Sequence, residues 1–75
     1  MSNMEAEIAA AKFAVSANLK RLRKSKSLAQ ERLALEAGVD RTVVSKIERE
    51  VANPSLEILV RLAVARDVQV SALLR

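Results

Sequence analysis

Gly38 is the only glycine in this chain of 75 residues, and it stands between two short segments with helical spacing. Apolar residues repeat on one face of each segment, namely Leu33, Ala34 and Ala37 before the glycine and Val44 and Ile47 after it. Glycine adopts a positive φ without steric cost, so a helix that must turn sharply ends well on this residue. Asp40 then offers a side-chain oxygen that can cap the second helix. Residues 30–49 are therefore predicted to form a helix, a tight turn and a second helix.

The second of these helices has a polar outer face. Its outward positions carry hydrogen-bond donors and short polar groups that suit the edges of DNA bases: Arg41, Thr42, Ser45, Lys46 and Arg49. The small side chain of Ala34 lets the two helices approach each other closely. Two short helices held in this way have the form of a DNA-binding helix-turn-helix, whose second helix enters the major groove.

From Leu19 to Leu74 the sequence resembles the Cro/CI-type helix-turn-helix family, also called the XRE family, of bacterial and phage regulators. The resemblance rests on the segments LKRLR, QERLA, AGVDRTVVSKIER and NPSLEILVRLA. It implies an all-α, compact five-helix lambda-repressor-like DNA-binding domain with the helix-turn-helix at its second and third helices. It also implies an ion pair between Arg23 and Glu48, and a backbone-phosphate contact from the amide of Gln30 at a helix N-terminus.

A chain of this length is expected to form a single domain over residues 1–75. It contains neither cysteine nor histidine, so we expect no disulfide, no metal site and no cofactor. Phe13 is the only aromatic residue, which argues against modules that stack single-stranded bases on aromatic rings. No apolar run approaches the roughly 20 residues that span a bilayer. Without a signal peptide, a cytoplasmic location is expected.

Positive charge is concentrated in one part of the chain. Residues 18–49 carry nine Lys and Arg against four Asp and Glu, a net charge of +5. Residues 1–17 have a net charge of −1, and residues 50–75 are balanced. A solvated basic helix surface would by itself account for such an excess. Because the excess coincides with the helix-turn-helix, we interpret it as a surface that faces phosphates.

Residues 2–25 are predicted to form a long first helix, because they are rich in helix formers and contain no glycine or proline. Ser2 and Glu5 have the spacing of a capping box. Residues 1–14 form an N-terminal helical extension that precedes the part resembling the family. This extension could enlarge the core, contact a second subunit or fray in solvent, and the sequence does not choose between these.

Two further helices are expected after the helix-turn-helix. Pro54 disfavours a helical conformation at Asn53, and Ser55 is a good N-cap for a fourth helix. A short fifth helix is expected from about Val70 to the end of the chain. The alternating Val68-Gln69-Val70 could form a strand, but the chain offers no partner strand.

Several positions depart from the family pattern where helices begin or end. Many relatives have glycine after the first, third and fourth helices, a Ser or Thr before the second, and a serine before the fifth. The residues at these positions here are Ser27, Glu50, Asp67, Ala29 and Gln69. These departures predict modest stability or an unusual loop after Glu50 rather than a different fold.

The site residues are predicted in three groups. The base-contacting residues are Arg41, Thr42, Ser45 and Lys46. The residues that contact phosphates are Gln30, Lys20, Arg23, Arg49 and Asn53. The dimer interface is expected to use Leu56, Val70 and Leu74, whereas Leu73 is assigned to the core.

The predicted function is sequence-specific, major-groove binding of double-stranded DNA by a homodimer on a (pseudo)palindromic operator, because one recognition helix reads only a few base pairs. DRTVVSKIER on a short chain is similar to restriction–modification controller proteins; a phage repressor or a toxin–antitoxin regulator is equally compatible. The alternative is an antitoxin-type helical module whose main partner is another protein. Catalysis is not expected, because adjacent Ser45 and Lys46 point about 100° apart on a helix. Neither a small-molecule effector nor a membrane partner is expected.

Overall fold

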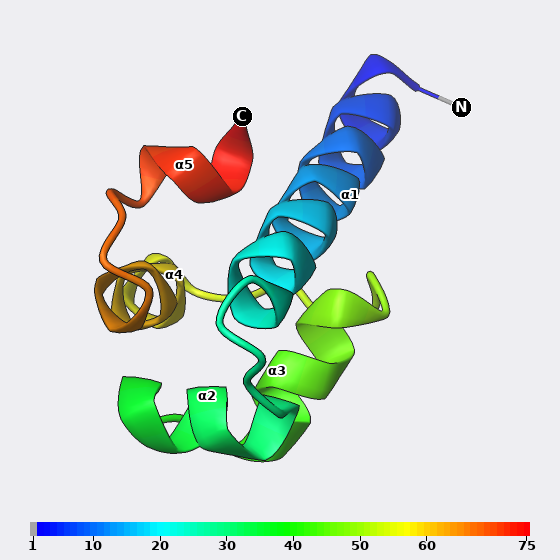
Figure 1. The fold of residues 1–75 in the computed structure, drawn as a ribbon. Coiled ribbons are helices and arrows are strands. Elements are labelled where there is room, and N and C mark those ends of the chain that lie inside the picture. Colours follow the sequence, from blue (N-terminus) through cyan, green and yellow to red (C-terminus); the bar gives the residue numbers. More distant parts are fainter. Residues whose placement is uncertain (1) are drawn as a thin grey trace.

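The computed structural model describes residues 2–75 (Figure 1). Its helices are α1 (Asn3–Lys24), α2 (Gln30–Ala37), α3 (Arg41–Glu48), α4 (Leu56–Ala65) and α5 (Ser71–Leu74). The all-α prediction with five helices is confirmed, and residues 68–70 form no strand. The last helix begins at Ser71, one residue later than expected, with Val70 as its N-cap. No helix of the described part is long and apolar enough to cross a bilayer.

The helices pack around one core at the C-terminal half of α1. The helix pair α2 and α3 lies at one end of α1, α4 packs on α2, and α5 returns to α1 (Figure 1). The buried apolar residues are Val15, Leu19, Leu33, Ala34, Ala37, Val44, Ile47, Leu59, Leu62, Ala63 and Leu73. Full burial of a leucine contributes about 1.5–3 kcal/mol, so the four fully buried leucines dominate this small core.

Side-chain caps start three of the helices, as the sequence predicts. The Oγ of Ser2 accepts a hydrogen bond from the N–H of Glu5 at 3.1 Å, and the Oγ of Ser55 accepts one from Ile58 at 3.1 Å. Asp40 caps α3 in the same way. Ala29 precedes α2 and offers no side-chain hydrogen bond, so this helix begins without a side-chain cap.

The helices α1 to α4 all end in the same backbone motif. In each, a residue one to three positions after the helix adopts a left-handed conformation: Ser27 (φ 55°), Gly38 (φ 69°), Glu50 (φ 64°) and Asp67 (φ 58°). The next residue donates its N–H back to a carbonyl five positions earlier, from Leu28 to Arg23, Val39 to Ala34, Val51 to Lys46 and Val68 to Ala63. These are Schellman motifs, which favour glycine at the left-handed position. Only one of these four left-handed positions is a glycine. At the other three, a residue with a Cβ adopts the left-handed conformation, which L-residues disfavour.

Candidate nucleic-acid interface

The orientation of α3 follows from the turn that precedes it. Gly38 ends α2 in the left-handed conformation, and an added Cβ there would lie 3.1 Å from the guanidinium of Arg61. The Oδ1 of Asp40 then accepts hydrogen bonds from the N–H of Thr42 at 3.1 Å and from its hydroxyl at 2.8 Å. These two bonds lower the pKa of Asp40, which places a carboxylate at the N-terminus of α3 where the helix dipole favours it. Burial of Val44 and Ile47 determines which face of α3 points outward.

The predicted base-contacting side chains come together on this outward face of α3. Arg41, Thr42 and Lys46 are exposed, and Ser45 is half-buried. Neither Arg41 nor Lys46 takes part in a salt bridge with the described residues. Thr42 donates its hydroxyl hydrogen to Asp40, so this hydroxyl is already oriented by the helix cap. The face therefore presents two cationic side chains beside short polar ones.

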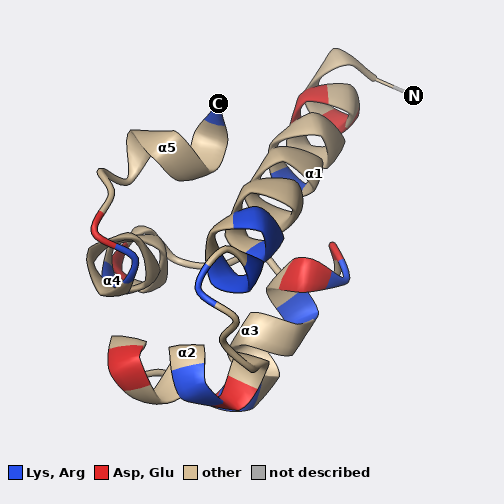
Figure 2. Ribbon diagram, viewed as in Figure 1, with Lys and Arg blue, Asp and Glu red and all other residues tan. Residues whose placement is uncertain are grey.

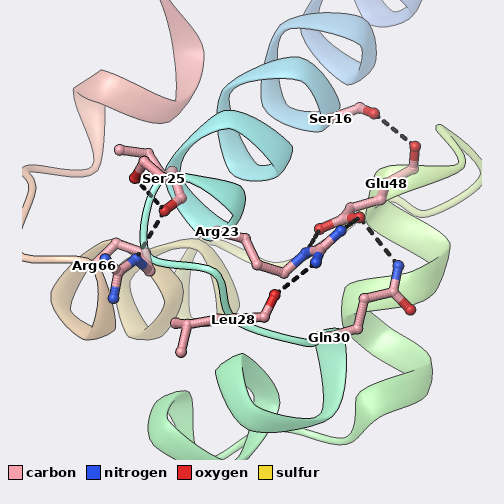
Figure 3. A network of polar contacts seen from close by, with 8 residues as sticks. Ser16, Arg23, Ser25, Leu28, Gln30, Glu48 and Arg66 are labelled. Atoms are coloured by element: carbon pink, nitrogen blue, oxygen red, sulfur yellow. Dashed lines mark hydrogen bonds and ion pairs between the residues drawn. The ribbon is translucent and has the colours of Figure 1, made fainter.

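Glu48, the last residue of α3, is the anchor of this helix (Figure 3). Arg23 of α1 donates to it from two nitrogens, Nε to Oε2 at 2.7 Å and Nη2 to Oε1 at 2.8 Å. Gln30, the first residue of α2, donates Nε2 to Oε1 at 3.0 Å. The structure thus contains the Arg23–Glu48 pair that the family resemblance implies, with side chains only 12% and 5% exposed. One carboxylate joins α1, α2 and α3.

The contacts of Glu48 keep its carboxylate charged despite its burial. Burial alone would raise the pKa of Glu48, but the hydrogen bonds from Arg23 and Gln30 and the nearby positive charges of Arg23 and Lys20 outweigh it, so the pKa is lowered. The hydrogen bond to Glu48 likewise raises the pKa of Arg23. Both members of the pair are therefore ionised at neutral pH, and removing either one leaves a buried, uncompensated charge.

Ser16 is a second anchor of α3 that the sequence analysis did not predict. It lies in α1, is 1% exposed, and donates its hydroxyl to the backbone carbonyl of Glu48 at 2.7 Å (Figure 3). The carbonyls of the last turn of a helix have no partner within the helix, and Ser16 supplies one. The sequence contains one signal for this contact, namely the position of Ser16 beside the apolar residues Val15 and Leu19. A small polar residue that is buried next to such a stripe needs a hydrogen-bond partner.

The predicted phosphate-contacting residues have different environments. Arg49 and Asn53 are exposed after α3, and Lys20 is half-buried on α1. Gln30 uses one amide hydrogen on Glu48. Arg23 is nearly buried and directs its third contact, from Nη1, to the carbonyl of Leu28 at 2.7 Å, so its observed contacts are all internal to the fold.

Charge is distributed unevenly over the fold. Figure 2 shows Lys and Arg gathered at the C-terminal end of α1, where this helix meets the connection to α2, with further basic positions on α3. The acidic residues of α1 lie at its opposite, N-terminal end. The basic end of α1 and the outer face of α3 thus belong to the same end of the molecule.

The residues predicted for a dimer interface lie at the start of α4 and at α5. Leu56, at the start of α4, is 68% exposed, and Leu74, in α5, is 49% exposed. Val70 is half-buried against the core. Val60 (41% exposed) and Val64 (68% exposed) continue from Leu56 at four-residue intervals, so α4 presents an outward apolar stripe.

These features define a class of protein. Two short helices joined by a left-handed glycine, with a polar, cation-bearing second helix anchored to a basic first helix, form a DNA-binding helix-turn-helix. The chain belongs to the helix-turn-helix family HTH_3, whose model matches residues 19–73. This XRE-type family comprises transcription regulators that bind double-stranded DNA, so the predicted family is confirmed.

Individual relatives agree with this assignment. The chain is 41% identical over 59 residues to the immunity repressor protein of Bacillus phage phi105; the match covers 79% of this chain and 41% of that repressor, so the chain spans less than half of this curated relative. The structure of a hypothetical transcription factor, NHTF, from Neisseria is similar with a TM-score of 0.83 and 34% identity, over 87% of this chain and 75% of that one. The restriction-modification controller protein C.AhdI from Aeromonas hydrophila gives a TM-score of 0.76 and 38% identity, over 80% and 91%.

Proposed function

We propose that this protein regulates transcription by binding a specific, (pseudo)palindromic operator in double-stranded DNA as a homodimer. The observation that carries the proposal is the outer face of α3, where Arg41 and Lys46 are exposed and form no salt bridge with the described residues. A cationic helix face without internal partners, at the basic end of the fold, is suited to the major groove.

The residues of α3 take different roles in this proposal. Arg41, at the N-terminal end of the helix, donates to guanine O6 and N7, and Lys46, five residues further along, reaches a second guanine edge. Thr42 offers its methyl group to thymine, because its hydroxyl hydrogen is already directed to Asp40. Ser45 reads a base at short range.

Phosphate contacts set the register of α3 on the duplex. Arg49, Asn53 and Lys20 supply these contacts, together with the second amide hydrogen of Gln30, whose first is bonded to Glu48. Arg23, which was predicted to bind phosphate, is assigned a different role here: its observed donor contacts are to Glu48 and Leu28, and it positions α3 instead.

Dimerisation follows from the small number of base pairs that one α3 can read. Two copies with recognition helices about 34 Å apart match half-sites one duplex turn apart. Leu56 and Leu74 supply exposed apolar surface for this contact, and Val70 supports it from beneath. Control of restriction–modification genes is the more specific proposal, and it is supported by the likeness to C.AhdI over 91% of that chain.

The proposal is tested by gel-shift with the DNA directly upstream of the protein's own gene, against random duplex, at two salt concentrations. Arg41→Ala or Lys46→Ala should weaken cognate binding by about 1–3 kcal/mol and spare random DNA. Arg49→Ala should weaken binding to both DNAs alike and reduce the salt dependence. Arg61→Ala is the matched control, because Arg61 is an exposed arginine of α4 whose observed partner is Glu57.

Two results would contradict these roles. If Arg41→Ala and Arg49→Ala lower the affinity for cognate and random DNA equally, α3 does not read bases. If the unaltered protein binds both DNAs with equal, wholly salt-sensitive affinity, the operator proposal is wrong, and a search for a protein partner tests the alternative.

A further inference from the structure

The apolar stripe of α1 continues beyond the part of the helix that the core covers. Val15 and Leu19 are buried, and Ile8 and Met4 extend the same face upstream at intervals of seven and four residues. Ile8 is 47% exposed and Met4 is 72% exposed, and every residue from Ser2 to Ala11 is exposed. In Figure 1 these first turns of α1 rise away from α2 and α3. An alanine-rich helix of this kind is marginal in water without packing, so its exposed face needs a partner.

A groove lies beside this stripe. Its volume is about 170 Å³, and it is bordered by Ile8, Ala11, Lys12, Pro54, Leu59 and Leu74. An apolar cavity of about 150 Å³ holds a benzene ring, so the groove has room for one large apolar side chain. Leu74 belongs to the interface proposed above, and the groove therefore joins that surface to the exposed stripe of α1.

The charges on the stripe indicate which partner fits. Glu5 and Lys12 lie on the same side of α1, where both line a surface hollow with Ile8, Ala9 and Glu50. They are seven residues apart, which is about 10.5 Å along the helix, so they are too far apart to pair with each other. Neither has an ion-pair partner among the described residues.

A second copy of α1, placed antiparallel across a two-fold axis, satisfies both charges. In such a contact residue i of one copy faces residue j of the other and j faces i. With the axis passing between Ile8 and Ala9, Glu5 of one copy lies against Lys12 of the partner subunit, and the reverse pair forms as well. The small side chain of Ala9 allows close approach at the centre.

We infer that the N-terminal half of α1 is a self-association surface, through which two copies pair antiparallel by Met4, Ile8 and Ala9, with reciprocal Glu5–Lys12 ion pairs. The inference extends the proposed homodimer from Leu74 onto α1 and rests on the proposal of a two-copy regulator. Glu5 and Glu7 make this end of the helix acidic, which opposes binding to DNA or to an anionic membrane. The surface complements its own copy instead.

Charge reversal tests the pairing without DNA, so that its result is independent of operator binding. Glu5→Lys and Lys12→Glu each turn two attractive pairs into two repulsive ones, and each should raise the dimer Kd in sedimentation velocity by roughly 10-fold or more. An equimolar mixture of the two variants should dimerise as the unaltered protein does, because the opposite charges then face each other. Glu7→Lys is the matched control: it makes the same charge change on another side of α1 and should leave Kd unchanged.

A second measurement tests the orientation. The chain contains no cysteine, so Ala9→Cys introduces a single thiol near the proposed axis, and a short thiol-specific cross-linker should join two copies rapidly. Ala10→Cys, at an exposed position about 100° further round α1 and away from Glu5 and Lys12, should cross-link far more slowly. Far-UV circular dichroism checks that each variant folds.

The inference is wrong if the unaltered protein sediments as a monomer at millimolar concentration, or if Glu5→Lys dimerises as tightly as Glu7→Lys. A mixture of Glu5→Lys and Lys12→Glu that stays as weak as either variant alone rules out the antiparallel register. If the unaltered protein dimerises as expected but does not bind an operator specifically, the proposed function is contradicted and this inference still holds.

Discussion

Replacing the non-glycine residues at the left-handed helix ends by glycine should stabilise this protein. Ser27 has a φ of 55° and Glu50 a φ of 64°, in the region where a Cβ meets the following carbonyl. Release of that contact is worth about 1–2 kcal/mol. Glycine also increases the conformational entropy of the unfolded chain, and this offsets about 0.5–1 kcal/mol of the gain. The expected net gain is about 0.5–1 kcal/mol for Ser27→Gly and for Glu50→Gly, and less for Asp67→Gly, because aspartate tolerates this conformation better.

Urea denaturation followed by circular dichroism measures this gain directly. Ser25→Gly is a matched control, since Ser25 lies two residues before Ser27 at a φ of −62°. That change should destabilise the protein by about 0.5–1 kcal/mol. The double variant Ser27→Gly, Glu50→Gly should show an additive gain and a melting temperature raised by about 4–8 °C per kcal/mol. If Ser27→Gly and Ser25→Gly change the free energy of unfolding in the same direction and by the same amount, the backbone at Ser27 is not strained.

Two substitutions and a pH titration test the caps and anchors of the helices. Ala29→Ser should stabilise the fold by about 1 kcal/mol in urea denaturation, because α2 lacks a side-chain cap; no change would show that the cap cannot form there. Ser16→Ala should cost about 1–3 kcal/mol, since it leaves the buried carbonyl of Glu48 without this donor; Ser16→Thr, if its methyl fits, should restore part of it. The lowered pKa of Glu48 stabilises the fold fully above the ordinary glutamate pKa of about 4.3, and this contribution is lost as the pH falls through the lower folded value. The urea midpoint should therefore fall between pH 6 and pH 3 by more in the unaltered protein than in Glu48→Gln, and equal falls would contradict the role of this carboxylate.

The sequence predicted the helices well because local signals agree along the chain. The apolar spacing around Gly38, the caps at Asp40 and Ser55 and the burial of Leu73 all appear in the structure as expected. Glycine is missing at Ser27, Glu50 and Asp67, and the family pattern alone does not show which backbone conformation these residues adopt. In the structure all three residues adopt the left-handed conformation that glycine favours, although each has a side chain. The apolar residue that follows each of these positions is a signal that could have predicted this.

Contacts between distant elements were harder to predict. The hydrogen bond from Ser16 to the carbonyl of Glu48 joins residues 32 positions apart and involves a main-chain atom, so no pairing of side-chain types indicates it. Asn18 is similar: its amide donates to the carbonyls of Leu73 and Arg75 and holds the end of the chain against α1. The family resemblance implies the Arg23–Glu48 pair, whereas the phosphate contact predicted separately for Arg23 is not favoured by its internal hydrogen bonds.

The anchoring of α3 separates the residues that hold this helix from those that face outward. Glu48, Val44 and Ile47 connect α3 to the rest of the fold, whereas Arg41 and Lys46 contribute to neither the core nor an ion pair among the described residues. Mutations at the outward positions therefore cost little folding free energy, because most surface substitutions change stability by less than about 0.5 kcal/mol. Such a helix can diversify its target sequence by drift at a few codons while the scaffold stays the same. Libraries randomised at these outward positions should consequently yield mostly folded proteins.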